Sequence, residues 1–214
     1  MDGRGNSISK RDIEFIKEKL LALQYKPFEK KFEINIKAVG YLTYLFQKIG
    51  IRPIIVGGHA VELYTAGHYT TVDVDIVLSG RDAAKEILER VGFTKHSGER
   101  HWYHKELGLP IEIPDDLLAG SMDKIIEVTF GDGFFVFVIG IEDLILDRAR
   151  AAVYWDSASD REWALLLLNA QWNDIDFDYL INEAIKEPQT KQNNGVYNLI
   201  LELIDETKNY NKHP

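Results

Sequence analysis

Hydrophobic residues recur at two spacings along the chain, and each spacing predicts one kind of element. Apolar side chains recur every three or four residues near the N-terminus and in the C-terminal third, which is typical of amphipathic helices. Between these regions, short apolar runs and alternating apolar and polar residues indicate strands. The pattern predicts helices over residues 9–24, 33–49, 59–66, 82–91, 142–155, 160–171, 177–186 and 197–208, and strands over 54–56, 72–78, 100–105, 111–113, 125–130 and 134–139.

The order of these elements predicts an α+β fold with a mixed sheet and helical layers packed around it. We expect an N-terminal helical extension over residues 1–50, a core with the sheet over 51–140, and a C-terminal helical region over 141–214. A length of 214 residues suits one compact unit built from these parts.

Composition narrows the classes of function. The chain has no cysteine, which excludes disulfides and thiolate metal sites. It has no apolar run that could cross a bilayer and no signal-peptide core, so we expect a cytoplasmic protein with no membrane partner. The net charge of −9 disfavours a long nucleic-acid duplex as partner, although basic clusters such as Lys95, Arg100 and Lys105 leave a polyanion open.

Two carboxylates on one predicted strand are the first candidate for chemistry. Asp73 and Asp75 alternate with Val72, Val74 and Ile76, so both acidic side chains point to the same face. Like charges on one strand face repel, and a divalent cation would compensate them. The alternative is an exposed strand face without a function.

A glycine pair is the second candidate. Gly57 and Gly58 lie between a buried strand and a helix that starts near His59. Glycine lets the backbone turn sharply and approach a ligand, and the amide groups at a helix start suit a phosphate. A plain structural turn is the other interpretation.

Glu112 is the third candidate, since it is the polar residue of a short apolar strand. If that strand neighbours the aspartate strand, three carboxylates share a patch that could hold two metal ions. Glu112 could also act as a base toward an attacking hydroxyl. An exposed surface glutamate is the alternative.

Two further residue types were weighed. Arg148 falls on an otherwise apolar helical stripe, which suggests either a phosphate partner or a buried ion pair with Asp160. The histidines show no metal-ligand spacing, and His101 and His104 lie three apart on a predicted strand, so they face opposite sides.

Together these motifs resemble the signature of the DNA polymerase β-type nucleotidyltransferase superfamily. The closer resemblance is to small prokaryotic nucleotidyltransferase-fold proteins related to abortive-infection toxins. In those proteins a Gly-Gly or Gly-Ser turn precedes a Thr-x-Asp-x-Asp strand, here Thr71–Asp75. A later Glu-Asp-Leu-Ile helix carries a basic residue, here Glu142–Ile145 and Arg148. His59 departs from the pattern, since many members carry serine there.

The resemblance implies transfer of a nucleoside monophosphate from an NTP to a hydroxyl acceptor, with Mg²⁺ (or Mn²⁺) as cofactor. The acceptor would be a small molecule, an RNA end or a protein, and a homodimer or an antitoxin-like partner is expected. The implied catalytic residues are Asp73, Asp75, Glu112 and Arg148, the first three as metal ligands, and the implied nucleotide-binding residues are Gly57, Gly58, His59 and Thr71. The rival hypotheses are a non-catalytic nucleotide-binding or regulatory protein and a structural protein with surface aspartates.

Overall fold

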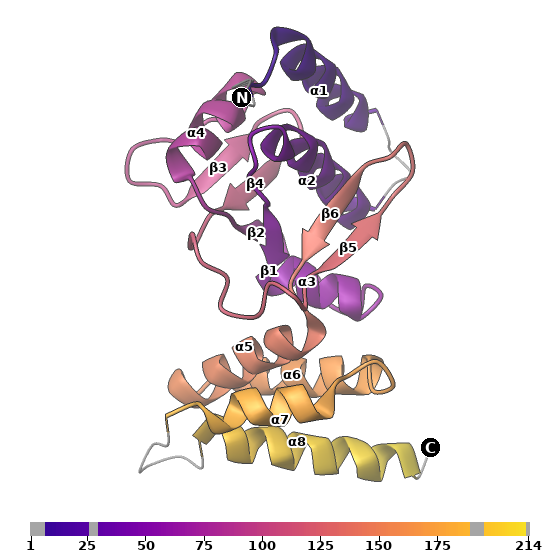
Figure 1. The fold of residues 1–214 in the computed structure, drawn as a ribbon. Coiled ribbons are helices and arrows are strands. Elements are labelled where there is room, and N and C mark those ends of the chain that lie inside the picture. The colour runs from indigo at the N-terminus through magenta and orange to yellow at the C-terminus, as the bar shows by residue number, and fades with distance from the viewer. Residues whose placement is uncertain (1–6, 26–29, 189–194, 213–214) are drawn as a thin grey trace, which may run out of the picture. The chain divides into compact units, whose positions relative to one another are not determined.

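The computed structural model describes residues 7–25, 30–188 and 195–212, and within these ranges it holds eight helices and six strands (Figure 1). Each helix and strand predicted from the hydrophobic pattern is present, with ends that differ by a few residues, so the α+β class is confirmed. The helices are α1 (Lys10–Leu23), α2 (Lys31–Gln47), α3 (Gly57–Tyr64), α4 (Arg81–Arg90), α5 (Ile141–Tyr154), α6 (Ala158–Ala170), α7 (Phe177–Ile185) and α8 (Gly195–Lys212). The strands are β1 (Ile54–Val56), β2 (Val74–Val77), β3 (His101–His104), β4 (Leu109–Glu112), β5 (Ile126–Thr129) and β6 (Phe135–Val138).

The strands form one mixed sheet in the order β3-β4-β2-β1-β6-β5. Strand β1 lies near its centre, antiparallel to β2 and parallel to β6, and β2 is in turn parallel to β4. Ile54 and Ile55 of β1 are buried, as expected for an apolar strand covered on both faces. The sheet order places the glycine turn after β1 next to the strand that carries Asp75.

The structure groups the chain into two compact units. One takes in the described residues up to His59, together with Thr71–Leu118 and Ile125–Val138, and it contains the sheet. The other takes in Ala60–Thr70, Ala119–Lys124 and the described residues from Ile139 onward. The predicted extension over residues 1–50 falls in the unit with the sheet, and the three-part domain division stays a prediction.

In the sheet unit, helix α2 contacts β6 and also both α1 and α4 (Figure 1). Its buried residues include Leu42, Leu45 and Phe46, which form part of the core over the sheet. Helix α1 begins at a capping box in which the Ser9 hydroxyl accepts from the Asp12 amide and the Asp12 carboxylate accepts from Ser9.

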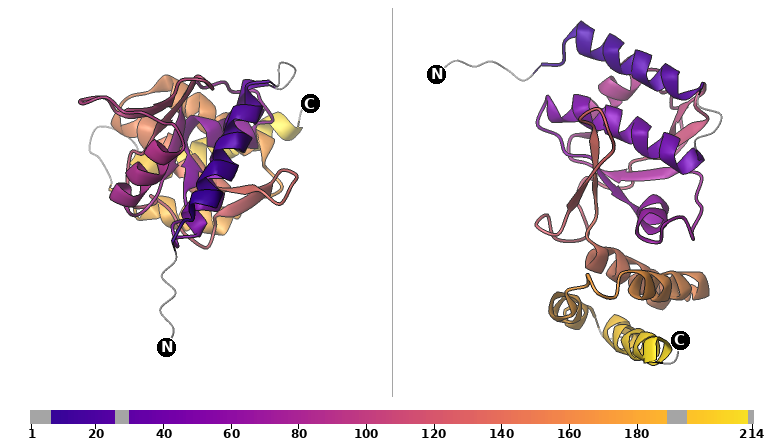
Figure 2. Two further views of the ribbon diagram at one scale, coloured as in Figure 1. Left: turned by 90° about the horizontal axis from the view of Figure 1, so that it is seen from above. Right: turned by 90° about the vertical axis from the view of Figure 1, so that its right-hand side faces the viewer.

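In the helical unit, α5 packs against α6, α7 and α8, and α8 also contacts α6 and α7 (Figure 2). Leu144, Ile145 and Leu146 of α5 are fully buried in this bundle. Among the described helices, none combines the length and apolar character needed to cross a membrane.

Candidate active site

The turn after β1 has room only for glycine at both positions. Gly57 has a φ of +60°, in the region that favours glycine, and a Cβ atom there would lie 2.4 Å from Oδ2 of Asp75. A Cβ atom on Gly58 would lie 2.9 Å from Cβ of Thr71. The turn therefore packs directly against Asp75 and Thr71, at the point where α3 begins with the amide groups of its first turn.

Strand pairing brings two of the predicted carboxylates side by side. Asp75 of β2 pairs with Val56 of β1 on one side and with Glu112 of β4 on the other. The strand of Glu112 thus neighbours the aspartate strand, which is the arrangement under which the sequence predicts a shared acidic patch. Asp75 lies next to the glycine turn, and Glu112 lies one strand farther along the sheet, since β2 is between β1 and β4.

Asp73 lies just outside the strand that the sequence predicts for it. Strand β2 starts at Val74, and the chain bends at the two residues before it. Val74 and Ile76 are fully buried as expected, but Val72 is 72% exposed. The alternation of faces therefore stops at Asp73, because the bend turns the preceding residues away from the sheet.

Hydrogen bonds on three sides hold Asp73 in place. Its Oδ1 accepts from the Thr71 hydroxyl at 3.2 Å, its Oδ2 lies 3.2 Å from Nε2 of His101, and its backbone carbonyl lies 2.8 Å from Nδ1 of His59. Burial raises the pKa of Asp73, but its own backbone amide and the bonds from His101 and Thr71 outweigh burial and hold the pKa below its usual value. Asp73 is therefore an ionised, fixed carboxylate at neutral pH.

His101 contacts both Asp73 and Glu112. Strands β3 and β4 are antiparallel with His101 opposite Glu112, and Nε2 of His101 lies 3.1 Å from Oε2 of Glu112. The same nitrogen lies 3.2 Å from Oδ2 of Asp73. Within the described residues, Asp73, His101 and Glu112 form the group whose ligand atoms all lie within 4.8 Å of one another, and Asp75 is outside this group.

Sequence reasoning missed His101 as a site residue. The spacing of histidines along the chain does not reveal His101, because it meets its partners across strands. The predicted hairpin around Leu107–Pro110 indicates where His101 lies, because an antiparallel hairpin places the first residue of one strand opposite the last residue of the other. His104, three residues on, is buried on the opposite face, as predicted.

Glu112 is a buried carboxylate with a guanidinium and an imidazole as neighbours. Its residue exposure is 9%, and its Oε1 lies 2.6 Å from Nη2 of Arg100, whose own side chain is mostly exposed. Its other oxygen, Oε2, faces His101. The alternative of an exposed surface glutamate is therefore wrong for this position.

His59 is completely buried, and both of its ring nitrogens have partners in the protein. Nδ1 faces the Asp73 carbonyl, and Nε2 lies 3.1 Å from the Asn35 side-chain amide. Burial lowers the pKa of His59 to about 4, so the ring is neutral at pH 7 and donates from Nδ1 while Nε2 accepts. In this structure His59 positions Asp73 and has no N–H left for a phosphate.

Arg148 belongs to the helical unit, where carboxylates surround it. Its Nη1 donates to Asp160 at 2.8 Å, and its Nε and Nη2 donate to Asp147. Burial lowers the pKa of Arg148, but the two carboxylates outweigh burial and raise it. This is the ion pair with Asp160 that formed the alternative interpretation of Arg148, and a catalytic role stays a prediction.

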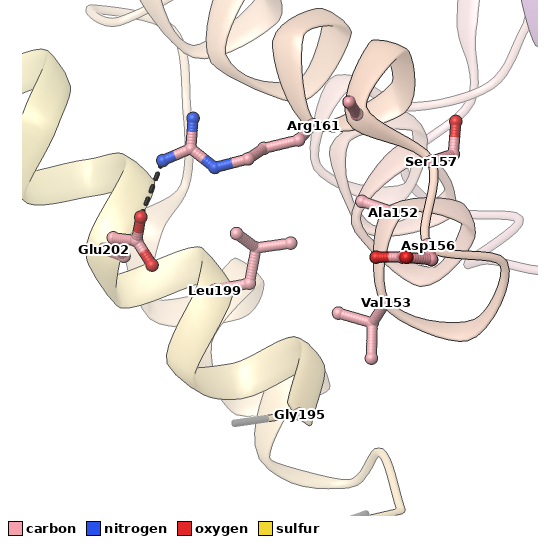
Figure 3. Close-up of a pocket in the computed structure, with 9 residues that line it drawn as sticks. Ala152, Val153, Asp156, Ser157, Arg161, Gly195, Leu199 and Glu202 are labelled. Atoms are coloured by element: carbon pink, nitrogen blue, oxygen red, sulfur yellow. Dashed lines mark hydrogen bonds and ion pairs between the residues drawn. The ribbon is translucent and has the colours of Figure 1, made fainter. Parts of the chain in front are cut away.

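Each unit has at least one hollow on its described surface. One, of about 530 Å³, is on the sheet unit and is lined by residues of β3 and the loop before it, among them His96, Arg100, His101 and Tyr103. The other, of about 340 Å³, is in the helical unit and includes Leu199 and Arg161, whose guanidinium donates to Glu202 at 2.6 Å (Figure 3). Only the first shares residues with the acidic cluster.

The donor set of the cluster fits a divalent metal ion. Carboxylate oxygens bind Mg²⁺ and Mn²⁺, and a neutral imidazole nitrogen binds first-row transition ions. Two carboxylates and one imidazole leave positions for water or substrate oxygens on a six-coordinate ion. A divalent cation site is therefore compatible with the residues present.

The sequence matches no model of a protein family and no curated protein. By structure, it is similar to an antigenic nucleotidyltransferase-like protein from Paracoccidioides brasiliensis, with a TM-score of 0.53 and 14% identity over 83% of this chain and 91% of the other. A weaker likeness is to the antibiotic-resistance factor ANT(2'')-Ia, with a TM-score of 0.43 and 12% identity over 97% of this chain and all of the other.

The first of these likenesses covers most of both chains, so it extends beyond the sheet alone. It agrees with the fold that the glycine turn and the aspartate strand predict, while the closeness to toxin-like members stays a prediction. The chain has a nucleotidyltransferase fold.

Proposed function

We propose that the protein is a divalent-metal-dependent nucleotidyltransferase that moves a nucleoside monophosphate from an NTP to a hydroxyl acceptor. The observation that carries the proposal is the position of Asp75 between the Gly57-Gly58 turn and Glu112, with Asp73 and Glu112 grouped around His101. Phosphoryl transfer depends on positioning and on charge neutralisation, and this arrangement offers both.

The glycine turn is the proposed place for the triphosphate. The first amide groups of a helix have no acceptor within the helix, and they follow Gly57 directly here. The absence of side chains at both turn positions lets phosphate oxygens approach the backbone. Thr71, which packs against Gly58 and donates to Asp73, fixes the aspartate relative to this turn.

Asp73, Asp75 and Glu112 are the proposed metal-holding residues. A bound divalent ion would neutralise phosphate charge and acidify the acceptor hydroxyl. In the reaction the acceptor oxygen bonds to the α-phosphorus, the bond to the bridging oxygen breaks, and pyrophosphate leaves. Glu112 is the proposed recipient of the hydroxyl proton through Oε1, which Arg100 would have to release, because Oε2 faces the metal-binding group.

The hollow over β3 is the proposed acceptor site. Across the sheet, the glycine turn after β1 is followed by Asp75 on β2, Glu112 on β4 and then His101 on β3. An acceptor must approach the α-phosphorus from the side opposite the leaving pyrophosphate. Arg100 and His101, which line the hollow, lie on the side of the cluster away from the glycine turn. Whether the acceptor is a small molecule, an RNA end or a protein, and whether a homodimer or antitoxin-like partner exists, remain predictions.

The test is transfer of label from α-³²P NTPs to a panel of acceptors, with Mg²⁺ or Mn²⁺ present. We expect transfer by the wild type and a loss of more than about 100-fold in Asp73→Asn and Asp75→Asn, since losing even a partner of a metal ligand costs 10–100-fold. Asp132→Asn is the matched control, because Asp132 is an exposed turn residue with a φ of +55° that asparagine also adopts. Equal transfer by all four proteins would contradict the proposal.

A non-catalytic nucleotide-binding protein is the second candidate function. One observation favours it: Arg100 occupies Oε1 of Glu112, the carboxylate proposed as base. Equilibrium binding of a fluorescent NTP analogue separates the two functions. Binding that Gly57→Ala abolishes, together with no transfer to any acceptor, would favour the binding protein.

A further inference from the structure

In the acidic cluster formed by Asp73, His101 and Glu112, two carboxylate oxygens face a single ring nitrogen. Nε2 of His101 lies within hydrogen-bond distance of Oδ2 of Asp73 and of Oε2 of Glu112. A ring nitrogen carries at most one hydrogen, so it can donate well to only one of the two carboxylates. A cation at this point would interact with both oxygens and with the nitrogen lone pair.

The spacing of the three atoms suits ligands of one ion. Bonds of about 2.1 Å at right angles place neighbouring ligand atoms about 3 Å apart. The two distances from Nε2 are 3.2 Å and 3.1 Å, and all three ligand atoms lie within 4.8 Å of one another. A small outward movement of these side chains would open the space for an ion.

The outer oxygens of both carboxylates have partners of their own. Oδ1 of Asp73 accepts from the Thr71 hydroxyl, and Oε1 of Glu112 pairs with Arg100. In each case the other oxygen is the one that faces His101. Carboxylates that bind metals through one oxygen are oriented in this way by hydrogen bonds to the other. This second set of contacts is independent of the spacing and points to the same centre.

We propose that His101 is a metal ligand together with Asp73 and Glu112, and that the imidazole makes this site prefer first-row transition ions such as Mn²⁺ over Mg²⁺. The inference rests on the proposed function insofar as it takes the acidic residues to bind a metal. Mg²⁺ prefers oxygen ligands alone, whereas transition ions gain affinity from an imidazole nitrogen. Asp75 lies outside this group, beside Glu112.

Direct metal binding tests this ligand without reference to catalysis. Titration calorimetry of the full chain with MnCl₂ and with MgCl₂, with and without a non-hydrolysable NTP, gives the ratio of the two affinities. Pulsed electron paramagnetic resonance of the Mn²⁺ complex reports whether an imidazole nitrogen is bound. The variants are His101→Gln, which removes the nitrogen ligand, and His101→Asp, which makes the site all-carboxylate. His68→Gln is the control, since His68 is an exposed histidine of the other compact unit.

We expect nitrogen modulation in the wild type and in His68→Gln, and its loss in His101→Gln with at least a tenfold fall in Mn²⁺ affinity. His101→Asp should lower the ratio of Mn²⁺ to Mg²⁺ affinity. Circular dichroism should show all variants folded. Mn²⁺ binding without nitrogen modulation, or with unchanged affinity in His101→Gln, would overturn the role of His101 while leaving the proposed function intact. Absence of divalent-ion binding in every condition would overturn the inference, and the label-transfer assay would then decide the proposed function separately.

Discussion

Two clusters of ionisable side chains, one in each compact unit, differ in how many hydrogen-bond donors they supply. Around Arg148, three guanidinium nitrogens serve two carboxylates, and the Ser157 hydroxyl also donates to Asp160. Around His101, one ring nitrogen faces two carboxylates. The outer oxygens of Asp73 and Glu112 have their own donors in Thr71 and Arg100, but their inner oxygens share that one nitrogen, and we propose that a cation completes this cluster.

Charge alone therefore does not identify a functional site in this protein. Both clusters contain two carboxylates beside a basic or imidazole group, and the resemblance implies a catalytic role for both Asp73 and Arg148. They differ in that Oδ2 of Asp73 and Oε2 of Glu112 share one ring nitrogen, whereas Arg148 offers separate nitrogens to its two carboxylates. We infer a structural role for the Arg148 cluster and a ligand-binding role for the His101 cluster, and four substitutions probe that division.

The largest effect is expected from Gly57→Ala. The new methyl group would lie 2.4 Å from the Asp75 carboxylate at a φ of +60°, so Asp75 must move and the backbone is strained. We expect nucleotidyl transfer to fall by more than about 100-fold, with a loss of about 1–2 kcal/mol in the free energy of unfolding from the left-handed backbone. Transfer assays and urea denaturation measure the two quantities, and wild-type transfer would refute the packing of Asp75 against the turn.

The next effect is a pH dependence carried by His59. Its pKa is about 4 in the folded protein and near 6.5 unfolded, so the unfolded chain binds more protons between these values. His59 therefore stabilises the fold fully above about pH 6.5, and this contribution falls as the pH drops toward 4, by up to about 3 kcal/mol. Denaturation curves from pH 4 to 8 should flatten in His59→Asn relative to the wild type; parallel curves would contradict the buried neutral ring.

A smaller effect on stability, and none on metal affinity, is expected from Arg148→Met. The change leaves the partly buried Asp147 and Asp160 carboxylates without the guanidinium, and we expect a loss of about 2 kcal/mol in the free energy of unfolding. Mn²⁺ affinity should stay within about threefold of wild type. His101→Gln should show the reverse, with metal affinity lost and stability little changed. A large fall in metal affinity in Arg148→Met would break the division between the two clusters.

The smallest effect is expected from Thr71→Val, which removes the hydroxyl that orients Oδ1 of Asp73 while keeping the shape of the side chain. Loss of a hydrogen bond that orients a ligand costs about tenfold in metal affinity. Calorimetric titration with Mn²⁺ measures it. Thr94→Val is the control, because the Thr94 hydroxyl lies outside the acidic cluster and contacts the Tyr103 carbonyl. An equal change in both variants would argue against the orienting role of Thr71.

Much of the fold was predictable because burial imposes its period on the sequence. For example, the apolar run Ile54-Ile55 and the apolar stripe of α5 predict buried surfaces from the order of residues alone. The sequence predicts that Asp75 and Glu112 share a patch only if their strands are neighbours, because a single sequence does not show which strands pair. The pairing of His101 with Glu112 depends on hairpin register, which the loop between β3 and β4 sets and the hydrophobic pattern does not.

His59 shows a second limit. Its place at the start of α3 was predicted, and its burial was not, because Asn35 and Phe32 of α2 cover it from a distant part of the sequence. A histidine at a helix start is exposed or buried according to such tertiary contacts. The sequence thus located the turn correctly while leaving the direction of this side chain undetermined.

The most direct test is a crystal structure with Mn²⁺ and a non-hydrolysable NTP, with data collected at the manganese absorption edge. The account predicts an anomalous peak about 2.1–2.2 Å from Oδ2 of Asp73 and Oε2 of Glu112, with the triphosphate at the Gly57-Gly58 turn. A nucleotide bound elsewhere, with no peak between these two carboxylates, would contradict it.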